Sequence, residues 1–212
     1  MTSQLRPAVV RLFYPAALVA LAAVWLLMFL FGGGALDRNV YEAIYAGRRP
    51  VLAAMAHGAT LLGEPTVLIG AGFAIAGWVW WRRHHPHLAL ALMLVILIGR
   101  GLSEVQKFCI ARARPDLEPH LVVVKTSSFP SGHATSSMIF YVALALALLP
   151  AGRSRSIGVG CAILLSLLIG LSRVMLGVHW PSDVIGGWSF GLLWVLLTLE
   201  RAKKLLGVPV TR

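Results

Sequence analysis

The chain has few of the residues that build metal sites and disulfides. Only two cysteines occur among 212 residues, Cys109 and Cys161, and neither belongs to a CxxC pair or a cysteine–histidine cluster. This composition argues against a zinc-binding module and against a disulfide framework. The two cysteines fall near opposite faces of the predicted membrane region, so we expect them not to pair.

Charged residues are also scarce, at 13% of the chain, and eight acidic residues stand against nineteen lysines and arginines. The net charge of +11 is a feature shared with nucleic-acid-binding proteins. Here, however, the basic residues are dispersed among apolar runs, without a basic tract, a zinc-finger spacing or an aromatic RNA-binding motif. We therefore expect no nucleic-acid partner and attribute the charge to membrane-protein loops and an anionic substrate.

Hydrophobic residues make up 58% of the sequence and are grouped in long runs, as in integral membrane proteins. The first run is longer than a signal-peptide core of about 7–15 residues, so we interpret it as a retained span. Two short helices are predicted to lie on the bilayer surface, one capped by Asp37 and running through residue 46, the other opened by Pro50 and reaching Leu62. The six predicted transmembrane helices are residues 12–31, 65–81, 88–98 with a less apolar continuation to 107, 134–149, 157–176 and 184–199.

The predicted fold is thus all-α, with residues 1–212 forming one domain: a six-transmembrane-helix bundle with short interfacial helices between spans one and two. An even number of spans places both termini on one side. Ten lysines and arginines lie on that side and nine on the other. Three of the nine, Lys107, Arg114 and Arg173, suit an anion site, and leaving them out gives ten against six. This bias predicts cytoplasmic termini and a site at the outer, periplasmic face. The compact chain without extra domains suggests a bacterial inner membrane.

Polar residues gather where the third, fourth, fifth and sixth spans meet one membrane face, whichever way the chain is oriented. With three fixed cations and no acidic cluster, this face predicts an anionic ligand such as phosphate. Ser131 and Gly132 stand at a predicted helix start, where free N–H groups favour a phosphate and glycine permits its close approach. The gathered residues are Lys107, Arg114, Ser131, Gly132, His133, Arg173, His179 and Asp183.

Two histidines at this face are available for chemistry. His179 precedes Asp183 by four residues, and Pro181 between them starts a predicted helix, so Asp183 can reach back to one imidazole nitrogen. This is the arrangement of a nucleophile or base with an orienting carboxylate. His133 has no carboxylate nearby in sequence and suits a proton donor to a leaving oxygen.

Two other interpretations of the polar residues fit the sequence less well. His133, His179 and Asp183 have the side chains of a three-ligand metal site, but three neighbouring cations would repel a divalent ion. Structural ion pairs between helices would need more acidic partners than this face contains. We therefore predict a site without a metal and without a cofactor.

Three motifs follow one another along the chain: Lys-x6-Arg-Pro, then Pro-Ser-Gly-His, then Ser-Arg-x5-His-x3-Asp. By these motifs the chain resembles the type 2 phosphatidic acid phosphatase family. Every specified position matches, and the six-span layout extends the resemblance over most of the chain. Soluble vanadate-dependent haloperoxidases share the motifs, but six apolar spans argue against them. The matching residues are Lys107, Arg114, Pro115, Pro130, Ser131, Gly132, His133, Ser172, Arg173, His179 and Asp183.

The resemblance implies a metal-independent lipid phosphatase that works at the outer membrane face. His179 would be the nucleophile and form a phosphohistidine, Asp183 would orient it, and His133 would protonate the leaving group. The phosphoryl oxygens would be held by Lys107, Arg114, Ser131, Gly132 and Arg173.

The motifs do not distinguish a hydrolase from a lipid phosphotransferase of the same family, in which a second lipid accepts the phosphoryl group. A phospholipid transporter without enzymatic activity is a further alternative. The expected partner is a phosphorylated membrane lipid: phosphatidic acid, phosphatidylglycerophosphate, an isoprenyl diphosphate or a lipid A phosphate. We expect selectivity among them to depend on residues 35–63 and 116–129.

Overall fold

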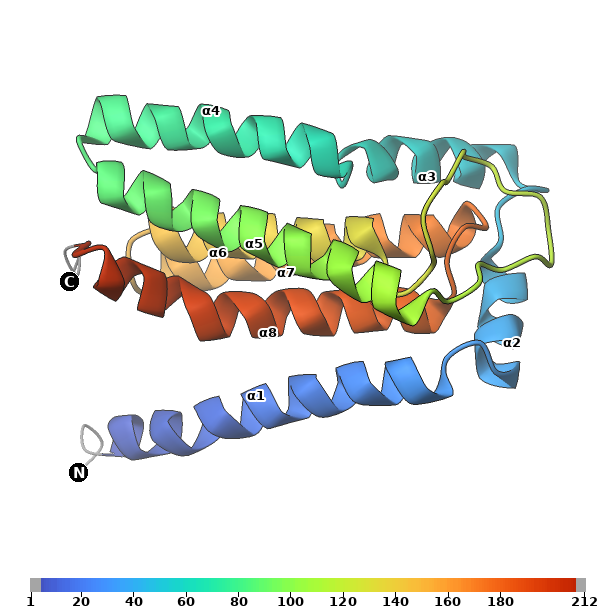
Figure 1. Ribbon diagram of the computed structural model, residues 1–212, viewed down its shortest axis with the longest axis horizontal. Coiled ribbons are helices and arrows are strands. Elements are labelled where there is room, and N and C mark those ends of the chain that lie inside the picture. The colour runs from blue at the N-terminus through green and yellow to red at the C-terminus, as the bar shows by residue number, and fades with distance from the viewer. Residues whose placement is uncertain (1–4, 209–212) are drawn as a thin grey trace.

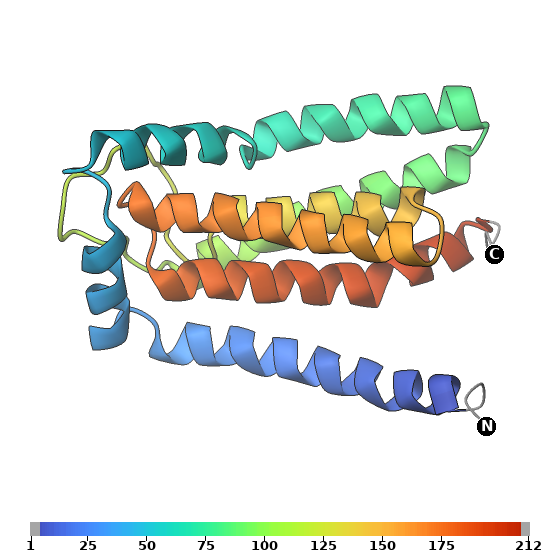
Figure 2. The same ribbon diagram turned by 180° about the vertical axis from the view of Figure 1, so that it is seen from behind.

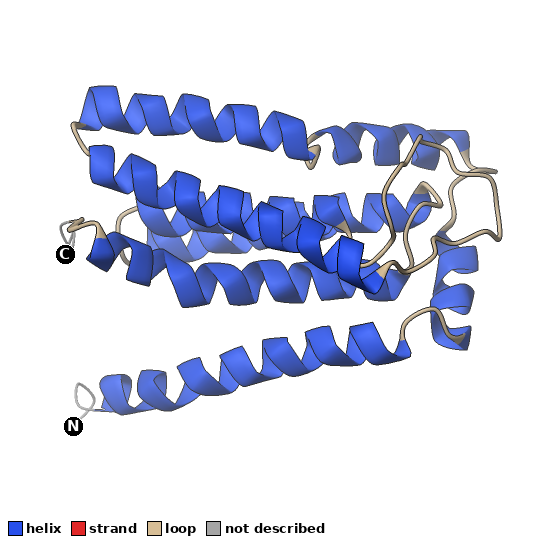
Figure 3. Cartoon of the chain, in the orientation of Figure 1, coloured by secondary structure: helices blue, strands red, loops and turns tan. Residues whose placement is uncertain are grey.

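A computed structural model describes residues 5–208, with side chains from Tyr14 onward, and every regular element in this range is an α-helix (Figure 3). The all-α prediction is therefore confirmed for the described residues. The helices are α1 (Leu5–Phe31), α2 (Ala35–Ile44), α3 (Pro50–Leu61), α4 (Pro65–Arg83), α5 (Pro86–Ile110), α6 (Gly132–Leu148), α7 (Arg153–Met175) and α8 (Pro181–Leu205).

Six of these helices form one bundle. Figures 1 and 2 show α1 and α4 to α8 running side by side, while α2 lies across one end. The described chain begins and ends at the opposite end of the bundle (Figure 1). Helix α6 packs against α4, α5, α7 and α8, and α1 packs against α8. The long loop 111–131 and the turn 176–180 therefore share the end that carries α2.

The number of membrane spans was predicted as six, and the helices support part of this count. Four segments are long and apolar enough to cross a membrane: Tyr14–Phe31, α5, α7 and α8. Helices α3 and α4 pass the same test only as a bent pair. The apolar helix α6 has 17 residues, or about 25 Å, against a hydrocarbon core of about 30 Å. The chain is thus an integral membrane protein, and the count of six spans stays a prediction.

The segment between the first two spans differs from the prediction of two surface-lying helices. Helix α2 does lie across the bundle, but α3 continues along the direction of α4 with a bend of about 40° (Figure 1). Helix α3 packs against α7. Gly63 permits this contact, because a Cβ there would lie 2.2 Å from Cγ2 of Ile169. Pro65 begins α4 as predicted, since proline suits the first helical turn.

The interior of the bundle is closely packed and apolar. Leu92 of α5, Ile139 of α6 and Val195 of α8 belong to one buried cluster. Gly99 lets α8 approach α5, because a Cβ there would lie 2.5 Å from the indole nitrogen of Trp194. Small residues commonly permit such close packing between membrane helices. The packing fixes the ends of α5 to α8 relative to one another, and the predicted site residues lie at those ends.

Candidate active site

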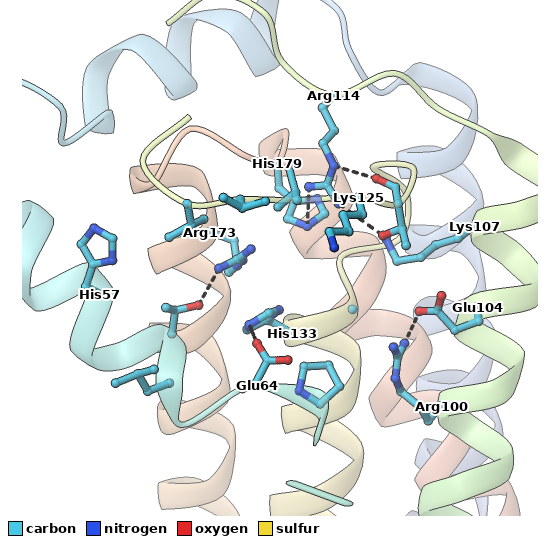
Figure 4. Close-up of a pocket in the computed structure, with 18 of the residues that line it drawn as sticks. His57, Glu64, Arg100, Glu104, Lys107, Arg114, Lys125, His133, Arg173 and His179 are labelled. Atoms are coloured by element: carbon cyan, nitrogen blue, oxygen red, sulfur yellow. Dashed lines mark hydrogen bonds and ion pairs between the residues drawn. The ribbon is translucent and has the colours of Figure 1, made fainter. Parts of the chain in front are cut away.

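A cavity of about 540 Å³ is lined by residues at the α2 end of the bundle (Figure 4). Six of the eight predicted site residues line it, and the remaining two, Ser131 and Asp183, are fully buried. Parts of both segments expected to govern selectivity also line the cavity, namely α3 and residues 122–126. The six lining site residues are Lys107, Arg114, Gly132, His133, Arg173 and His179.

Three cations surround the cavity, and each is held by oxygen atoms of the protein. Lys107, in the last turn of α5, donates to the carbonyl of Ser127 at 2.7 Å. Arg114 donates to the carbonyl of Val178 at 2.6 Å. Arg173, in the last turn of α7, donates to Oγ1 of Thr60 at 2.7 Å.

None of these three cations forms an ion pair with a described carboxylate. Lys107 and Arg173 are only 4% and 5% exposed. Nε of Arg173 is buried and has no hydrogen-bond partner among the described residues. Buried charges are normally paired, so the two buried cations and the half-buried Arg114, all without an ion pair, are suited to receive an anion.

His179 lies on the turn between α7 and α8, and Asp183 lies in the first turn of α8. Trp180 between them has extended backbone, and its N–H donates to Oδ2 of Asp183 at 2.9 Å. Nδ1 of His179 is 3.5 Å from the same oxygen. Asp183 therefore does reach back toward the imidazole, although 3.5 Å is longer than a normal hydrogen bond.

Ser128, which the sequence analysis missed, lies between the two side chains. Its hydroxyl donates to Oδ2 of Asp183 and is 3.3 Å from Nδ1 of His179. The hydroxyl can thus accept a hydrogen bond from Nδ1–H of the imidazole while donating one to the carboxylate. Ser128 connects His179 to Asp183.

Arg112 was also missed, and it anchors Asp183 from behind. Its Nη1 lies 2.8 Å from Oδ1 of Asp183, and its Nη2 donates to the carbonyls of Met28 and Phe29 at 2.8 and 2.7 Å. The guanidinium also stacks 4.2 Å above the ring of Phe129. The end of α1 is therefore joined to the carboxylate that faces His179.

His133 is the second residue of α6, and it does have a carboxylate partner. Its Nε2 lies 3.2 Å from Oε2 of Glu64, which precedes α4 (Figure 4). The backbone N–H of Ser131 donates to the carbonyl of Asp183 at 3.0 Å, so the start of α6 is tied to α8. Oγ of Ser131 is buried without a partner among the described residues. A Cβ on Gly132 would lie 3.6 Å from Cε of Lys107.

The environment of His179 favours a neutral imidazole. Burial lowers its pKa well below the ordinary value, and the neighbouring cations of Arg114, Lys107 and Arg173 lower it further. Nε2 of His179 is 3.3 Å from Nη1 of Arg114 and borders the cavity. With Nδ1 facing Ser128 and Asp183, an unprotonated Nε2 can face a ligand in the cavity.

Comparison with known proteins places this geometry in context. Residues 88–205 match the model of the PAP2 superfamily. Phosphatidylglycerophosphatase B of Bacillus subtilis is 36% identical over 166 residues, covering 76% of this chain and 80% of that protein. Lipid A 1-phosphatase of Rhizobium johnstonii is 40% identical over 116 residues, covering 50% and 45% of the two chains.

The fold is also that of a solved structure. A transmembrane PAP2-type phosphatidylglycerolphosphate phosphatase from Bacillus subtilis superposes with a TM-score of 0.81 and 30% sequence identity. The superposition covers 92% of this chain and 98% of the other.

Proposed function

The chain belongs to the PAP2 superfamily, and from that premise we propose that it is a membrane lipid phosphatase acting through a phosphohistidine intermediate. The observation that carries the proposal is the cavity in which three unpaired cations, Lys107, Arg114 and Arg173, surround the buried imidazole of His179. A phosphate held by these cations would lie beside Nε2 of His179. A lipid tail could remain in the bilayer while its phosphate enters.

In the first step, Nε2 of His179 attacks the phosphorus atom. Nδ1–H of His179 donates to the Ser128 hydroxyl, which donates to Asp183, so the imidazole keeps the tautomer with a free Nε2 lone pair. Arg112 holds the carboxylate in place. The cations stabilise the charge on the phosphoryl oxygens in a loose, in-line transition state.

The leaving oxygen receives its proton from His133 as its bond to phosphorus breaks. In the second step, a water molecule attacks the phosphohistidine and gives a proton back to His133. The P–N bond then breaks, which releases inorganic phosphate and restores His179. The protein residues supply every proton transfer in this scheme, and we propose that no metal ion is needed.

The names of the relatives suggest phosphatidylglycerophosphate and a lipid A 1-phosphate as candidate substrates. Phosphatidic acid and an isoprenyl diphosphate offer the same exposed phosphate. The charge bias of the loops supports cytoplasmic termini in the inner membrane, with the cavity at the periplasmic face.

The test is phosphate release from these four lipids by purified protein in detergent with excess chelator. We expect free phosphate from at least one lipid, and no release by a folded His179→Ala variant. A phosphorylated acceptor lipid in place of free phosphate would instead identify a phosphotransferase. No turnover of any lipid, or full activity of His179→Ala, would contradict the proposed mechanism.

A further inference from the structure

A carboxylate is an unexpected group in a cavity suited to an anion. Glu64 lines the cavity, and Figure 4 shows its carboxylate directed at His133. A negative charge close to a bound phosphate opposes binding. The other glutamate that lines the cavity, Glu104, is paired with Arg100, so its charge is largely compensated. Among the described residues Glu64 forms an ion pair with His133 alone, and its other oxygen accepts a long hydrogen bond of 3.4 Å from Oγ1 of Thr66.

The junction between α3 and α4 holds Glu64 in this position from several sides. Tyr141 of α6 donates to the carbonyl of Leu62 at 2.8 Å. Thr60, in the last turn of α3, accepts a hydrogen bond from Arg173 at 2.7 Å. A Cβ on Gly63 would lie 3.4 Å from Cδ2 of His133. The backbone beside Glu64 is therefore packed against α6 and α7, and the carboxylate does not depend on a mobile loop to reach His133.

We propose that Glu64 is a positioning residue for His133, an inference that rests on the proposed function. Burial and the neighbouring cation of Arg173 lower the pKa of His133. The carboxylate of Glu64, accepting a hydrogen bond from Nε2–H of His133, opposes these effects and favours the imidazolium form, as the carboxylate of a His–Asp pair does. The other ring nitrogen makes no hydrogen bond among the described residues and carries the proton that is transferred.

In the transfer step, the N–H bond at that second nitrogen breaks and an O–H bond forms on the leaving oxygen. The P–O bond cleaves with its electron pair going to the same oxygen. His133 is then neutral and still donates to Glu64 through Nε2–H. When water attacks the phosphohistidine, the second nitrogen takes up the proton that the water loses.

The leaving group tests this role, because an alkoxide needs a proton donor and an acidic phenol does not. The two substrates are phosphatidic acid and 4-nitrophenyl phosphate, assayed with purified protein in detergent. The quantity compared is kcat/KM, because it reports the first step, through departure of the leaving group, and not the hydrolysis of the phosphohistidine that both substrates share. We expect Glu64→Gln to lower kcat/KM on phosphatidic acid roughly ten- to hundredfold, less than the 10²–10⁴-fold contribution of a positioned acid. Its kcat/KM on 4-nitrophenyl phosphate should change by less than about threefold, because the nitrophenolate leaves without a proton.

Three further variants make the comparison decisive. His133→Ala should lose more activity on phosphatidic acid than Glu64→Gln does, again with little loss on 4-nitrophenyl phosphate. Tyr141→Phe, which removes the hydrogen bond to the α3–α4 junction, should show a smaller loss on phosphatidic acid. The matched control is Glu200→Gln, because Glu200 lies near the C-terminal end of α8, away from the cavity, and pairs with Lys203 at 2.8 Å. This control should leave both activities unchanged.

Each pattern of results has one reading. Equal loss on both substrates in Glu64→Gln, or no loss on either, would overturn the role of Glu64. If His133→Ala is selective and Glu64→Gln is not, only this inference fails. If His133→Ala lowers both activities equally, the proton-donor role in the proposed function fails as well. Should Glu64→Gln not fold, the absence of selectivity in Tyr141→Phe would count against the inference.

Discussion

Replacing Arg112 with methionine tests whether this residue acts through Asp183. The substitution keeps much of the side-chain length but removes the contact to Oδ1 of Asp183 and both hydrogen bonds to the end of α1. The carboxylate is fully buried, so it would be left without its cation. Removal of one partner from a buried pair typically costs about 3–5 kcal/mol of stability.

The size of the effect on activity follows from what Asp183 retains. Ser128 and the N–H of Trp180 still donate to Oδ2, so the carboxylate is loosened rather than lost. We expect kcat to fall about 10²-fold, against roughly 10⁴-fold for Asp183→Asn by analogy with a hydrolase triad. The melting temperature should fall by roughly 6–20 °C, at about 2–4 °C per kcal/mol for a chain of this size.

A variant that carries both Arg112→Met and Asp183→Asn tests whether Arg112 acts on kcat only through Asp183. If it does, this double variant should have the same kcat as Asp183→Asn within about threefold, because the effects of coupled residues are not additive. Losses that multiply to roughly 10⁶-fold would refute the reasoning. Arg48→Met is the matched control, since this arginine forms an exposed pair with Glu118 and should matter by less than about 1 kcal/mol.

Three other predictions follow from the same geometry. Gly63→Ala should lower stability by about 1–3 kcal/mol in thermal unfolding, because its Cβ would overlap Ile169, whereas Gly58→Ala meets nothing within 4 Å and should not destabilise. Arg114→Gln should move the acidic limb of the pH profile of kcat/KM to higher pH, because Arg114 lowers the pKa of His179 and its removal lets the imidazole become protonated at a higher pH. A profile whose acidic limb does not move would contradict this prediction. Activity should survive excess EDTA, and a loss restored by one divalent ion would show that a metal is required.

Prolines in the sequence correctly predicted where two of the helices begin. Pro65 and Pro181 begin α4 and α8, as expected of prolines in a first helical turn. The motif residues converge on one end of the bundle because an even number of passages separates them. The two cysteines are unpaired, as predicted from their places on the spans.

The missed residues could not be read from local pattern. Glu64 approaches His133 only because α3 packs on α7, and Ser128 reaches His179 only through the path of a loop without periodicity. Arg112 left no local signal either. It stands two residues before Arg114 on a non-helical segment, where residues two apart in an extended chain point to the same side. Yet Arg114 borders the cavity and Arg112 contacts the buried carboxylate of Asp183.

The contact between Glu64 and His133 bears on what counts as the minimal functional unit. The family model covers residues 88–205, and by that boundary the preceding helices would be an exchangeable membrane anchor. Yet one wall of the cavity is formed by α3 and its junction with α4. A chimera that takes residues 88–205 from this chain and its first helices from a relative would combine two halves of one proton-transfer site. The turnover of this chimera should then depend on which residue of the relative's helices lies opposite His133.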